Sequence, residues 1–480
     1  MISCLLVANR GEIALRVFRS CRDAGIGTVA VFSDPDSGSP HVSGADAAVR
    51  LPGSAPAQTY LNGEAIVAAA LTAGADAVHP GYGFLAEDPA FARLVLSAGL
   101  TWVGPPPEAM DAMARKIRAR KSAAAAGLPV LPELDPAAVS SFPVLVKASA
   151  GGGGRGMRAV FAAADLAAAI ESAQREAQAA FGDGTVFCEP LLTGARHVEV
   201  QVLADHHGTV WALTERDCSV QRRYAKVIEE TPSPAVGPAL RDRLASAAAA
   251  LATAVGYVSA GTVEFLVGGP GSDGEREFYF LEFNTRLQVE PPVTECVHGL
   301  DLVGLQLAIA DGRPLHGRPP PAAGHAIEAR LYAEDPADGF RPSAGPVHAI
   351  AVTGVDVAFG LPPGHGAGAG SGHVPAPFLR LDSGVEAGSV VAPYYDAMLA
   401  KVIAWAPDRE GAVRRLAAAL TSARLAGPAT NRDLLVSVLR GRAFGSGQAD
   451  TSLLAGFDYA ALAPSGELCE LAAAAAAGGG

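Results

Sequence analysis

The chain has 480 residues, of which 49% are hydrophobic and 18% charged, and its formal net charge is −12. This length allows about two to four domains with a substantial core, and the acidic balance excludes a nucleic-acid binder that works through a basic surface. The six cysteines show no CxxC spacing and no apolar run approaches a membrane span, so we expect a cytoplasmic protein with reduced thiols, no zinc site, no signal peptide and no membrane segment.

The N-terminal region predicts a strand–helix–strand unit. Residues 2–8 and 27–33 are apolar strand candidates, and residues 12–24 carry apolar side chains at helical spacing. This succession predicts a parallel sheet. The turn after the first strand lacks the glycine fingerprint of dinucleotide-binding folds, which disfavours an NAD-type cofactor. A further strand at 75–78 runs into His79–Asp88, which is either the edge of a site or a tight connection.

A proline cluster at residues 105–107 marks the first domain boundary. A helix is predicted next, through residues 116–126, and Lys116 begins it among several other basic residues. A solvated helix face is the ordinary explanation of such a run, and without context we prefer it.

The most informative stretch is residues 143–158, PVLVKASAGGGGRGMR. An apolar strand ends at Lys147, and four glycines and two arginines follow; the glycines are Gly151, Gly152, Gly153 and Gly154. Glycine lets the backbone approach a ligand, and bare N–H groups with cations at the rim form a site for a polyphosphate. A flexible linker is the alternative, but the preceding strand and the flanking cations favour the phosphate loop. The spacing matches neither a P-loop nor GxGxxG.

The segment after the glycines predicts a lid and then a hairpin. Residues 143–190 combine the glycine loop, a helix and a strand that contains Glu189, which suits a small α+β lid over a nucleotide. Two strands, 197–205 and 209–217, follow as a hairpin. Residues 218–234 mix charges with few core positions, so we expect a polar loop with a functional role.

Two adjacent strands, residues 261–268 and 277–284, each contain one carboxylate among apolar neighbours. Glu264 and Glu282 are therefore costly to bury unless they are paired or metal-bound. Together with Asn284 they form an oxygen-donor set suited to Mg²⁺. Two exposed edge glutamates are the alternative, which the apolar neighbours disfavour.

The following stretch, residues 285–295, places Arg286, Gln288 and Glu290 at alternate positions. In an extended chain these three side chains share one face. A cation, an amide and a carboxylate on one side can bind a small oxyanion and move its proton. An exposed strand face has the same pattern, so the residues alone leave both interpretations open.

From about residue 325 the sequence changes character. Residues 325–336 predict a strand with Arg330 among apolar neighbours, and residues 354–377 predict a long loop rich in glycine, proline and histidine. Helices are predicted at 409–425 and 431–441. After Pro464 the chain is a low-complexity end with no core to make.

Together these segments resemble the biotin carboxylase component of biotin-dependent carboxylases, a branch of the ATP-grasp superfamily, over nearly the whole chain. The motifs that carry the resemblance are ANRGEIA (8–14), HPGYGFL (79–85), KASAGGGGRGMR (147–158), RHVEVQ (196–201), ERDCSVQRR (215–223), GTVEFL (261–266), EFNTRLQVE (282–290), EARLYAEDP (328–336) and YYDAML (394–399). So many ordered motifs make the resemblance specific. It disfavours another ATP-grasp ligase such as a carbamoyl-phosphate synthase module.

The resemblance implies an α/β fold, with α+β character in the lid and the C-terminal part. The expected parts are a Rossmann-like N-terminal domain at 1–112, an ATP-grasp domain at 113–324 with its lid at about 127–191, a C-terminal biotin carboxylase domain at 325–445 and a low-complexity tail at 464–480.

The resemblance also implies an ATP-dependent ligase. ATP phosphorylates bicarbonate to carboxyphosphate, which breaks down to CO₂, and CO₂ carboxylates N1′ of biotin on a carrier protein. The implied cofactors and substrates are ATP, a pair of Mg²⁺ (or Mn²⁺) ions and carrier-bound biotin. The expected partners are a biotin carboxyl carrier protein and the carboxyltransferase subunit of an acyl-CoA carboxylase complex, on other chains because the sequence has no Met-Lys-Met biotin acceptor, and a second copy in a homodimer.

The family's functional residues carry over onto matching positions. The implied ATP contacts are Lys116, Lys147, Gly151 to Gly154, Glu189 and Leu192 at the adenine, and His197 and Gln221 near the ribose. The implied metal ligands are Glu264, Glu282 and Asn284. The implied bicarbonate contacts are Lys226, Arg286, Gln288 and the backbone of Val289. Glu290 would deprotonate bicarbonate, and Arg330 would stabilise the biotin enolate.

Three local departures from the family pattern motivate a second hypothesis. Ala114-Arg115 stands where the family usually has Gly-Asp, Tyr224-Ala225 replaces His-Gln, and Pro291 replaces a histidine after Glu290. We expect Tyr224 to remove a nucleotide contact, and Pro291 to restrict the backbone of the base. The second hypothesis is therefore a catalytically impaired scaffold or regulatory subunit, although every charged group assigned to chemistry is present.

Overall fold

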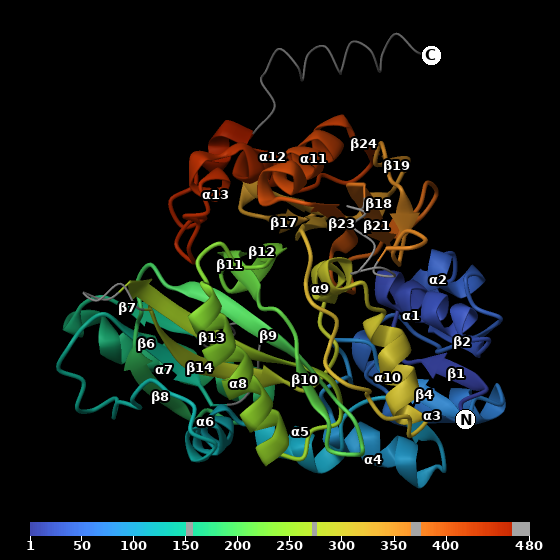
Figure 1. Cartoon of the computed structure of the whole chain (residues 1–480), viewed down its shortest axis with the longest axis horizontal. Helices are drawn as coiled ribbons and strands as arrows, with labels where there is room; N and C mark the ends of the chain where they lie inside the picture. The colour runs from blue at the N-terminus through green and yellow to red at the C-terminus, as the bar shows by residue number, and fades with distance from the viewer. Residues whose placement is uncertain (150–156, 271–275, 366–375, 463–480) are drawn as a thin grey trace.

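The computed structural model describes residues 1–149, 157–270, 276–365 and 376–462. The chain forms an N-terminal lobe, a middle lobe and a C-terminal lobe, coloured blue, cyan to yellow, and orange to red in Figure 1. Within the described ranges, no single helix is long and apolar enough to cross a membrane; α9 (Pro291–His298) and α10 (Leu302–Ala310) pass that test only as a pair bent by 95°.

The N-terminal lobe is a parallel sheet with a core on each face, as the strand–helix–strand pattern predicted. The strand order is β3-β2-β1-β4-β5. Because successive strand side chains point to opposite faces, Leu5 and Val7 pack with α1 and α10, whereas Leu6 packs with α3 and α4. The elements are β1 (Cys4–Val7), α1 (Gly11–Asp23), β2 (Gly27–Phe32), α2 (Pro40–Ser43), β3 (Ala47–Arg50), α3 (Gly63–Thr72), β4 (Ala77–His79), α4 (Pro89–Ser97) and β5 (Thr101–Trp102).

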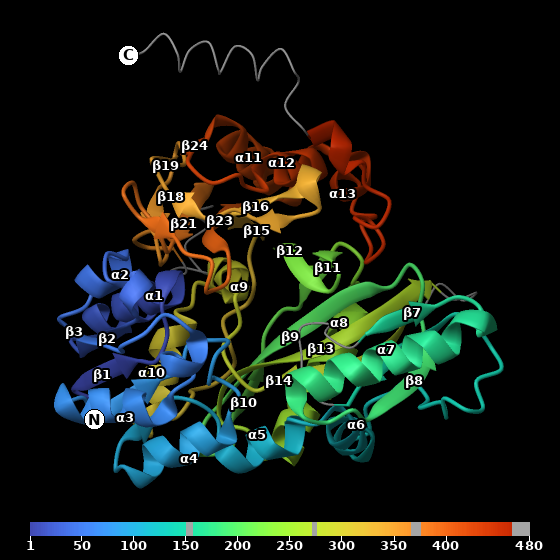
Figure 2. The same ribbon diagram turned by 180° about the vertical axis from the view of Figure 1, so that it is seen from behind.

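The lid is a small antiparallel sheet covered by one helix, the α+β composition expected for it. After α5 (Pro107–Met113) and α6 (Lys116–Ala125), the strands β6 (Val144–Ala148), β7 (Arg158–Val160) and β8 (Val186–Pro190) pair in the order β7-β6-β8. The helix α7 (Ala163–Phe181) packs on them (Figure 2), with Val146 and Ala173 in the shared core. The glycines predicted to form the phosphate loop, Gly151 to Gly154, lie outside the described residues.

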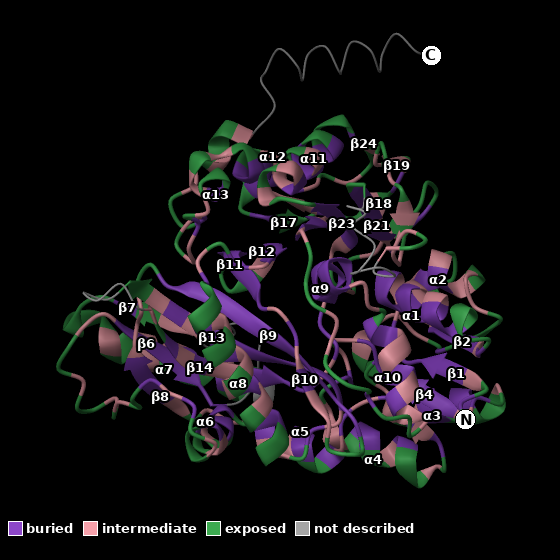
Figure 3. Cartoon of the chain, viewed as in Figure 1, coloured by how far each residue is buried: buried purple, intermediate pink, exposed green. Residues whose placement is uncertain are grey.

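A long, mostly antiparallel sheet joins the middle and C-terminal lobes. Its order is β14-β13-β9-β11-β12-β15-β23-β21-β20, with β10 paired to β9. Figure 3 shows β9 and β13 as largely buried. The strands are β9 (Arg196–Ala204), β10 (Val210–Ala212), β11 (Arg216–Arg222), β12 (Ala225–Thr231), β13 (Ser259–Pro270), β14 (Arg276–Asn284), β15 (His325–Tyr332), β20 (Val357–Ala358), β21 (Phe378–Ser383) and β23 (Met398–Ala406). The pairing of β12 with β15 carries the sheet across the position expected to separate two domains.

Helices cover this sheet, and those of the C-terminal lobe lie where the sequence predicted them, at 409–425 and 431–441. Helix α8 (Pro238–Ala254) packs beside β9 and β10, and α11 (Arg409–Ser422) and α12 (Arg432–Arg440) cover β15 and β23. The remaining short elements are β16 (Glu334–Asp335), β17 (Arg341–Pro342), β18 (Gly345–Pro346), β19 (Ala349–Ala351), β22 (Val390–Val391), β24 (Arg424–Ala426) and α13 (Arg442–Gly445), with 3-10 turns at 34–36, 56–58, 336–338 and 459–462.

Three local predictions were wrong. The single strand predicted at 209–217 is split into β10 and the start of β11. The polar loop predicted at 218–234 is largely the β11–β12 hairpin, because charged side chains such as Lys226 and Glu229 find partners on other elements inside the protein. The extended conformation assumed for residues 285–290 is absent: no strand is assigned there, and Glu290 has φ −83° and ψ −5° just before α9.

Candidate active site

Lys226, on β12, is the centre of a buried cluster of charges. Its Nζ donates to Glu199 Oε2 at 2.5 Å, to Glu264 Oε1 at 2.8 Å and to Glu290 Oε1 at 2.5 Å. Burial alone would lower the pKa of Lys226, but these three carboxylates outweigh it and raise that pKa well above its ordinary value. The lysine is therefore a permanent cation. We call Lys226, Glu199, Glu264, Glu290 and Arg330 the Lys226 group.

Glu290 lies between two cations. Besides Lys226, it accepts a hydrogen bond at 3.0 Å from Nη2 of Arg330, on β15. Burial would raise the pKa of Glu290, but Lys226 and Arg330 hold it below its ordinary range. Glu290 is thus an ionised, 2% exposed carboxylate, which can accept a proton from an acid that binds beside it.

Glu264 collects donors from three further side chains. It accepts hydrogen bonds from Asn284 Nδ2 at 2.8 Å, from Gln288 Nε2 at 2.9 Å and from His197 Nε2 at 2.7 Å. Burial would raise the pKa of Glu264, but Lys226 and His197 outweigh it and hold that pKa well below its ordinary value. The carboxylate therefore stays ionised.

Glu282 lies directly opposite Glu264 on the paired strands β13 and β14. Burial raises the pKa of Glu282, the negative charge of Glu264 raises it further, and Lys116 opposes both. Two facing carboxylates repel each other unless a cation lies between them. With the amide oxygen of Asn284, this hard-oxygen set fits a divalent cation such as Mg²⁺.

Arg286 and Gln288, which were expected to share one face with Glu290, point in different directions in the structure. Gln288 reaches the Lys226 group through Glu264, but Arg286 turns toward the N-terminal lobe, where its Nε pairs with Glu87 Oε2 at 2.8 Å. A contact of 3.4 Å to Asn284 Oδ1 is its link to the carboxylate cluster. The backbone carbonyl of Val289 accepts a hydrogen bond from Lys401 Nζ at 2.9 Å.

The residues assigned to ATP lie on the lid and on the neighbouring strands. Nζ of Lys147, on β6, pairs with Glu189 Oε1, on β8, at 2.8 Å, and Arg120 also donates to Glu189. His197 Nδ1 lies 3.4 Å from Gln221 Oε1, and Leu192 is half-buried just after β8.

Lys116 is only 9% exposed, so the solvated helix face considered for it is wrong. Burial lowers its pKa, while Glu282 raises it and Lys147 lowers it. These interactions place Lys116 between the lid and the carboxylates of β13 and β14. A cation at that position suits the phosphates of a nucleotide.

Several buried charges of this site were missed in the sequence. Arg216, on β11, is fully buried and donates to Glu199 Oε1 at 2.5 Å and Gln201 Oε1 at 2.8 Å. Glu229 pairs with Arg330 Nε at 2.6 Å. The signal that identified Glu264, a lone charge among apolar neighbours, is absent at both positions, because Arg216 lies between Glu215 and Asp217 and Glu229 lies beside Glu230.

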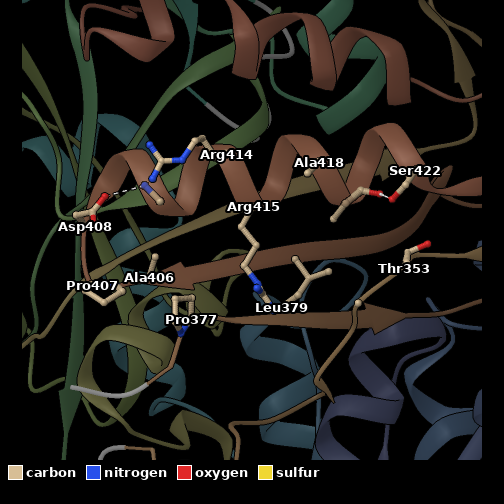
Figure 4. A pocket seen from close by; sticks show the side chains of 13 residues that line it. Thr353, Pro377, Leu379, Ala406, Pro407, Asp408, Arg414, Arg415, Ala418 and Ser422 are labelled. Carbon is tan, nitrogen blue, oxygen red and sulfur yellow. Dashed lines mark hydrogen bonds between the residues drawn. The ribbon is translucent and has the colours of Figure 1, made fainter. Parts of the chain in front are cut away.

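A cavity of about 680 Å³ lies apart from the Lys226 group, in the C-terminal lobe (Figure 4). It is lined by α11 and by parts of β21 and β23. Arg415 Nη2 crosses to Asp356 at 2.6 Å, and Asp408 caps α11 by accepting a bond from the Gly411 N–H at 2.7 Å, the dashed line in the figure. The described residues around this cavity include no member of the Lys226 group.

Comparison with known proteins identifies the family. The chain matches the models for the biotin carboxylase N-terminal domain over residues 1–110, the carbamoyl-phosphate synthase L chain ATP binding domain over 108–318 and the biotin carboxylase C-terminal domain over 328–456. A protein named biotin carboxylase from Halalkalibacterium halodurans is 43% identical over 95% of this chain and 97% of that protein.

Two further relatives are similar to the chain over most of its length. The mitochondrial methylcrotonoyl-CoA carboxylase subunit alpha of Oryza sativa is 45% identical over 94% of this chain, which spans 60% of that relative's length. The crystal structure of the biotin carboxylase domain dimer of Hydrogenobacter thermophilus 2-oxoglutarate carboxylase, with MgADP, ADP and bicarbonate, has a TM-score of 0.85 and 40% identity, covering 95% of this chain and 97% of that one. The chain therefore belongs to the biotin carboxylase family.

Proposed function

We propose that this chain is the biotin carboxylase component of an acyl-CoA carboxylase, which uses ATP and bicarbonate to carboxylate carrier-bound biotin through carboxyphosphate. The observation that carries the proposal is Glu290, a buried ionised carboxylate that lies between Lys226 and Arg330. The two cations can bind an oxyanion that still carries a proton, and the base between them can remove that proton.

The charges of the site suggest how bicarbonate is activated. The bicarbonate anion would share Lys226, with Arg286, Gln288 and the backbone of Val289 as its further contacts. Once the anion shares the cations that depress the pKa of Glu290, that pKa rises and Glu290 becomes a stronger base. It takes the O–H proton, and the carbonate oxygen attacks the γ-phosphorus of ATP, releasing ADP and leaving carboxyphosphate.

The second half of the reaction needs a positive charge near biotin. Carboxyphosphate breaks into CO₂ and phosphate, the phosphate removes the N1′ proton of biotin, and N1′ attacks CO₂. Arg330 would stabilise the enolate oxygen that develops on the ureido ring. Its burial at 7% exposure supports this role, because a cation screened from water interacts more strongly with a developing charge.

ATP and a divalent metal ion fit the remaining groups. We assign Lys116, Lys147 and the loop Gly151 to Gly154 to the phosphates, Glu189 and Leu192 to the adenine, and His197 and Gln221 to the ribose. Glu264, Glu282 and Asn284 would hold Mg²⁺ or Mn²⁺, which supplies charge neutralisation on the phosphates. The opposed carboxylates of β13 and β14 support this assignment.

The domain boundaries and partners are part of the same proposal. The three matched family spans support domains at 1–112, 113–324 and 325–445. The relative named as a subunit alpha supports work with a biotin carboxyl carrier protein and a carboxyltransferase subunit, and the dimeric relative supports a homodimer. We assign the chain to the cytoplasm, the location expected from its sequence. The scaffold hypothesis is disfavoured, because Lys226, Glu290 and Arg330 meet in one buried group.

The proposal is tested by ATP hydrolysis with purified protein. We expect ADP release that depends on bicarbonate and is stimulated by free biotin. ATP consumption that is absent under all these conditions, or that ignores bicarbonate, would contradict the proposal.

A further inference from the structure

Glu328, on β15, is a carboxyl group that receives no hydrogen bond from any described residue. It is fully buried, and neither Oε1 nor Oε2 has a hydrogen-bond partner. No ion pair joins it to a described cation within 4.0 Å, whereas Arg330 on the same strand has two carboxylate partners. An isolated carboxylate in such a place is too costly to remain ionised, so the group neutralises instead.

A second carboxyl group lies directly across the sheet from it. In the antiparallel pairing of β12 with β15, Glu229 is the partner of Glu328. Opposed residues of such a pair lie on the same face with their Cβ atoms about 5 Å apart, and like charges there repel each other. Glu229 is also fully buried, but its Oε1 lies 2.6 Å from Nε of Arg330. Glu229 therefore lies against a cation, whereas no described cation lies within 4.0 Å of Glu328.

We propose that Glu328 is a protonated carboxylic acid that donates its O–H to the Glu229 carboxylate, and that this singly charged pair positions Arg330 behind the base Glu290.

The surrounding charges support one proton in this pair. The groups that face it are Lys226 of β12, Cys218 of β11, Glu199 of β9, Arg330 of β15, Lys401 of β23 and Glu290 before α9. Burial raises the pKa of Glu328 well above its ordinary value. The positive charge of Lys401 lowers this pKa, and the negative charge of Glu229 raises it further. Burial also raises the pKa of Glu229, to about 7, against the opposing effect of Arg330.

The shared proton affects how Arg330 interacts with its two partners, Glu229 and Glu290. Its Nε faces Glu229, and its Nη2 reaches Glu290 Oε2 at 3.0 Å. One negative charge on the pair balances the Nε edge and leaves Nη2 for Glu290 or a substrate oxyanion. Loss of the shared proton at high pH would put two negative charges beside Nε and pull the guanidinium away from Glu290. This catalytic consequence rests on the proposed function, but the protonation state does not.

Infrared difference spectroscopy of nucleotide-free protein at pH 7 tests the protonation state directly. We expect the C=O band of a protonated, buried carboxylic acid in wild type minus E328Q. The band should be absent from wild type minus E277Q, because Glu277 is an exposed glutamate on β14. If wild type minus E328Q has no such band, the proposal is overturned whether or not the protein hydrolyses ATP.

The positioning role is tested with two variants of the same residue. E328Q keeps a hydrogen-bond donor for Glu229 but has no titrating proton, so the alkaline limb of its kcat/KM profile for bicarbonate should move to higher pH. E328L offers no donor, and its kcat/KM should fall at least about tenfold below that of E328Q. Equal kcat/KM values for the two variants, or an unmoved alkaline limb in E328Q, would rule out positioning through Arg330. A wild-type protein with the band but without ATPase activity would refute only the proposed function.

Discussion

At the scale of single residues, Lys226 and Glu290 stay charged because groups of opposite charge surround each of them. Lys226 donates hydrogen bonds to three carboxylates, and Glu290 stays ionised because two cations face it. Such a cluster is expensive to bury and costly to break, since removing one partner leaves the others unpaired. Removing one member of the cluster that holds the base in place therefore destabilises the fold.

The Glu290→Gln variant tests the base. The amide keeps the shape and can still accept a hydrogen bond from Lys226, but it cannot take a proton from bicarbonate. We expect bicarbonate-dependent ATP hydrolysis to fall by about a hundredfold or more, while nucleotide binding, followed by equilibrium titration, stays close to that of wild type. Activity within about threefold of wild type would assign the base to another residue.

The Lys226→Met variant tests the electrostatic role of the lysine. It leaves Glu199, Glu264 and Glu290 without their shared cation, so the free energy of unfolding in urea should fall by about 3–5 kcal/mol. The matched control is Lys121→Met, at an exposed position of α6, which should change it by less than about 0.5 kcal/mol. Equal effects of the two substitutions would argue against a buried cation cluster.

The pH dependence of stability follows from the same charges. The folded pKa of Glu290 lies below its ordinary value of 4.5. Its ionisation therefore stabilises the fold fully above pH 4.5, and this contribution is lost as pH falls through the lowered folded pKa. In urea titrations between pH 3 and 7, wild type should lose more stability on acidification than Glu290→Gln. Parallel curves would contradict this.

At the scale of elements, the β11–β12 hairpin carries the main departure from the family pattern. Its turn residues Arg223 and Tyr224 have φ of 46° and 71°, a left-handed conformation that costs most side chains energy. Tyr224 is 38% exposed, and burial raises its pKa while Arg158 of the lid lowers it. Tyr224 therefore lies near the edge of the lid, close to Arg158.

Exchanging Tyr224 for the histidine usual in the family tests whether this departure weakens ATP binding. Histidine tolerates the left-handed turn better than tyrosine and can offer a ring N–H to the nucleotide. We expect Tyr224→His to lower the KM for ATP by about three- to tenfold with little change in kcat, measured by steady-state ATP hydrolysis. An unchanged KM would show that Tyr224 costs the enzyme no contact.

The structural features that could be predicted from the sequence are those whose residue pattern lies within one short segment. Apolar periodicity located β1, β2 and β4 of the parallel sheet, β13, β14 and several of the helices, and the isolated glutamates of β13 and β14 pointed to the site. The β11–β12 hairpin was missed because its polar residues are buried through partners on other elements, such as β9, β13 and β15, that lie far away along the chain. For the same reason Arg286 could not be placed, since its partner Glu87 lies in another lobe. Pro291 begins α9, where its missing N–H costs nothing.

At the scale of the whole molecule, buried ion pairs tie the lobes to the helix that follows the base. Glu295 of α9 accepts from Arg16 of α1 at 2.5 Å and from Arg380 of β21 at 2.7 Å. Lys401 of β23 reaches Glu12 of α1 at 3.3 Å and the carbonyl of Val289 at 2.9 Å. The backbone around Glu290 is thus held by contacts from both the N-terminal and the C-terminal lobe. These contacts keep Glu290 beside Lys226 and Arg330, which lie far from it in the sequence.

The central claim is that Lys226, Glu290 and Arg330 form one pocket in which bicarbonate is activated for transfer to biotin. The most direct measurement is the incorporation of ¹⁴C-labelled bicarbonate into free biotin by the purified chain with MgATP. We predict labelled carboxybiotin formed together with ADP, and its loss in Glu290→Gln. ADP formation with no label in biotin at any biotin concentration, or equal labelling by the variant, would contradict the account.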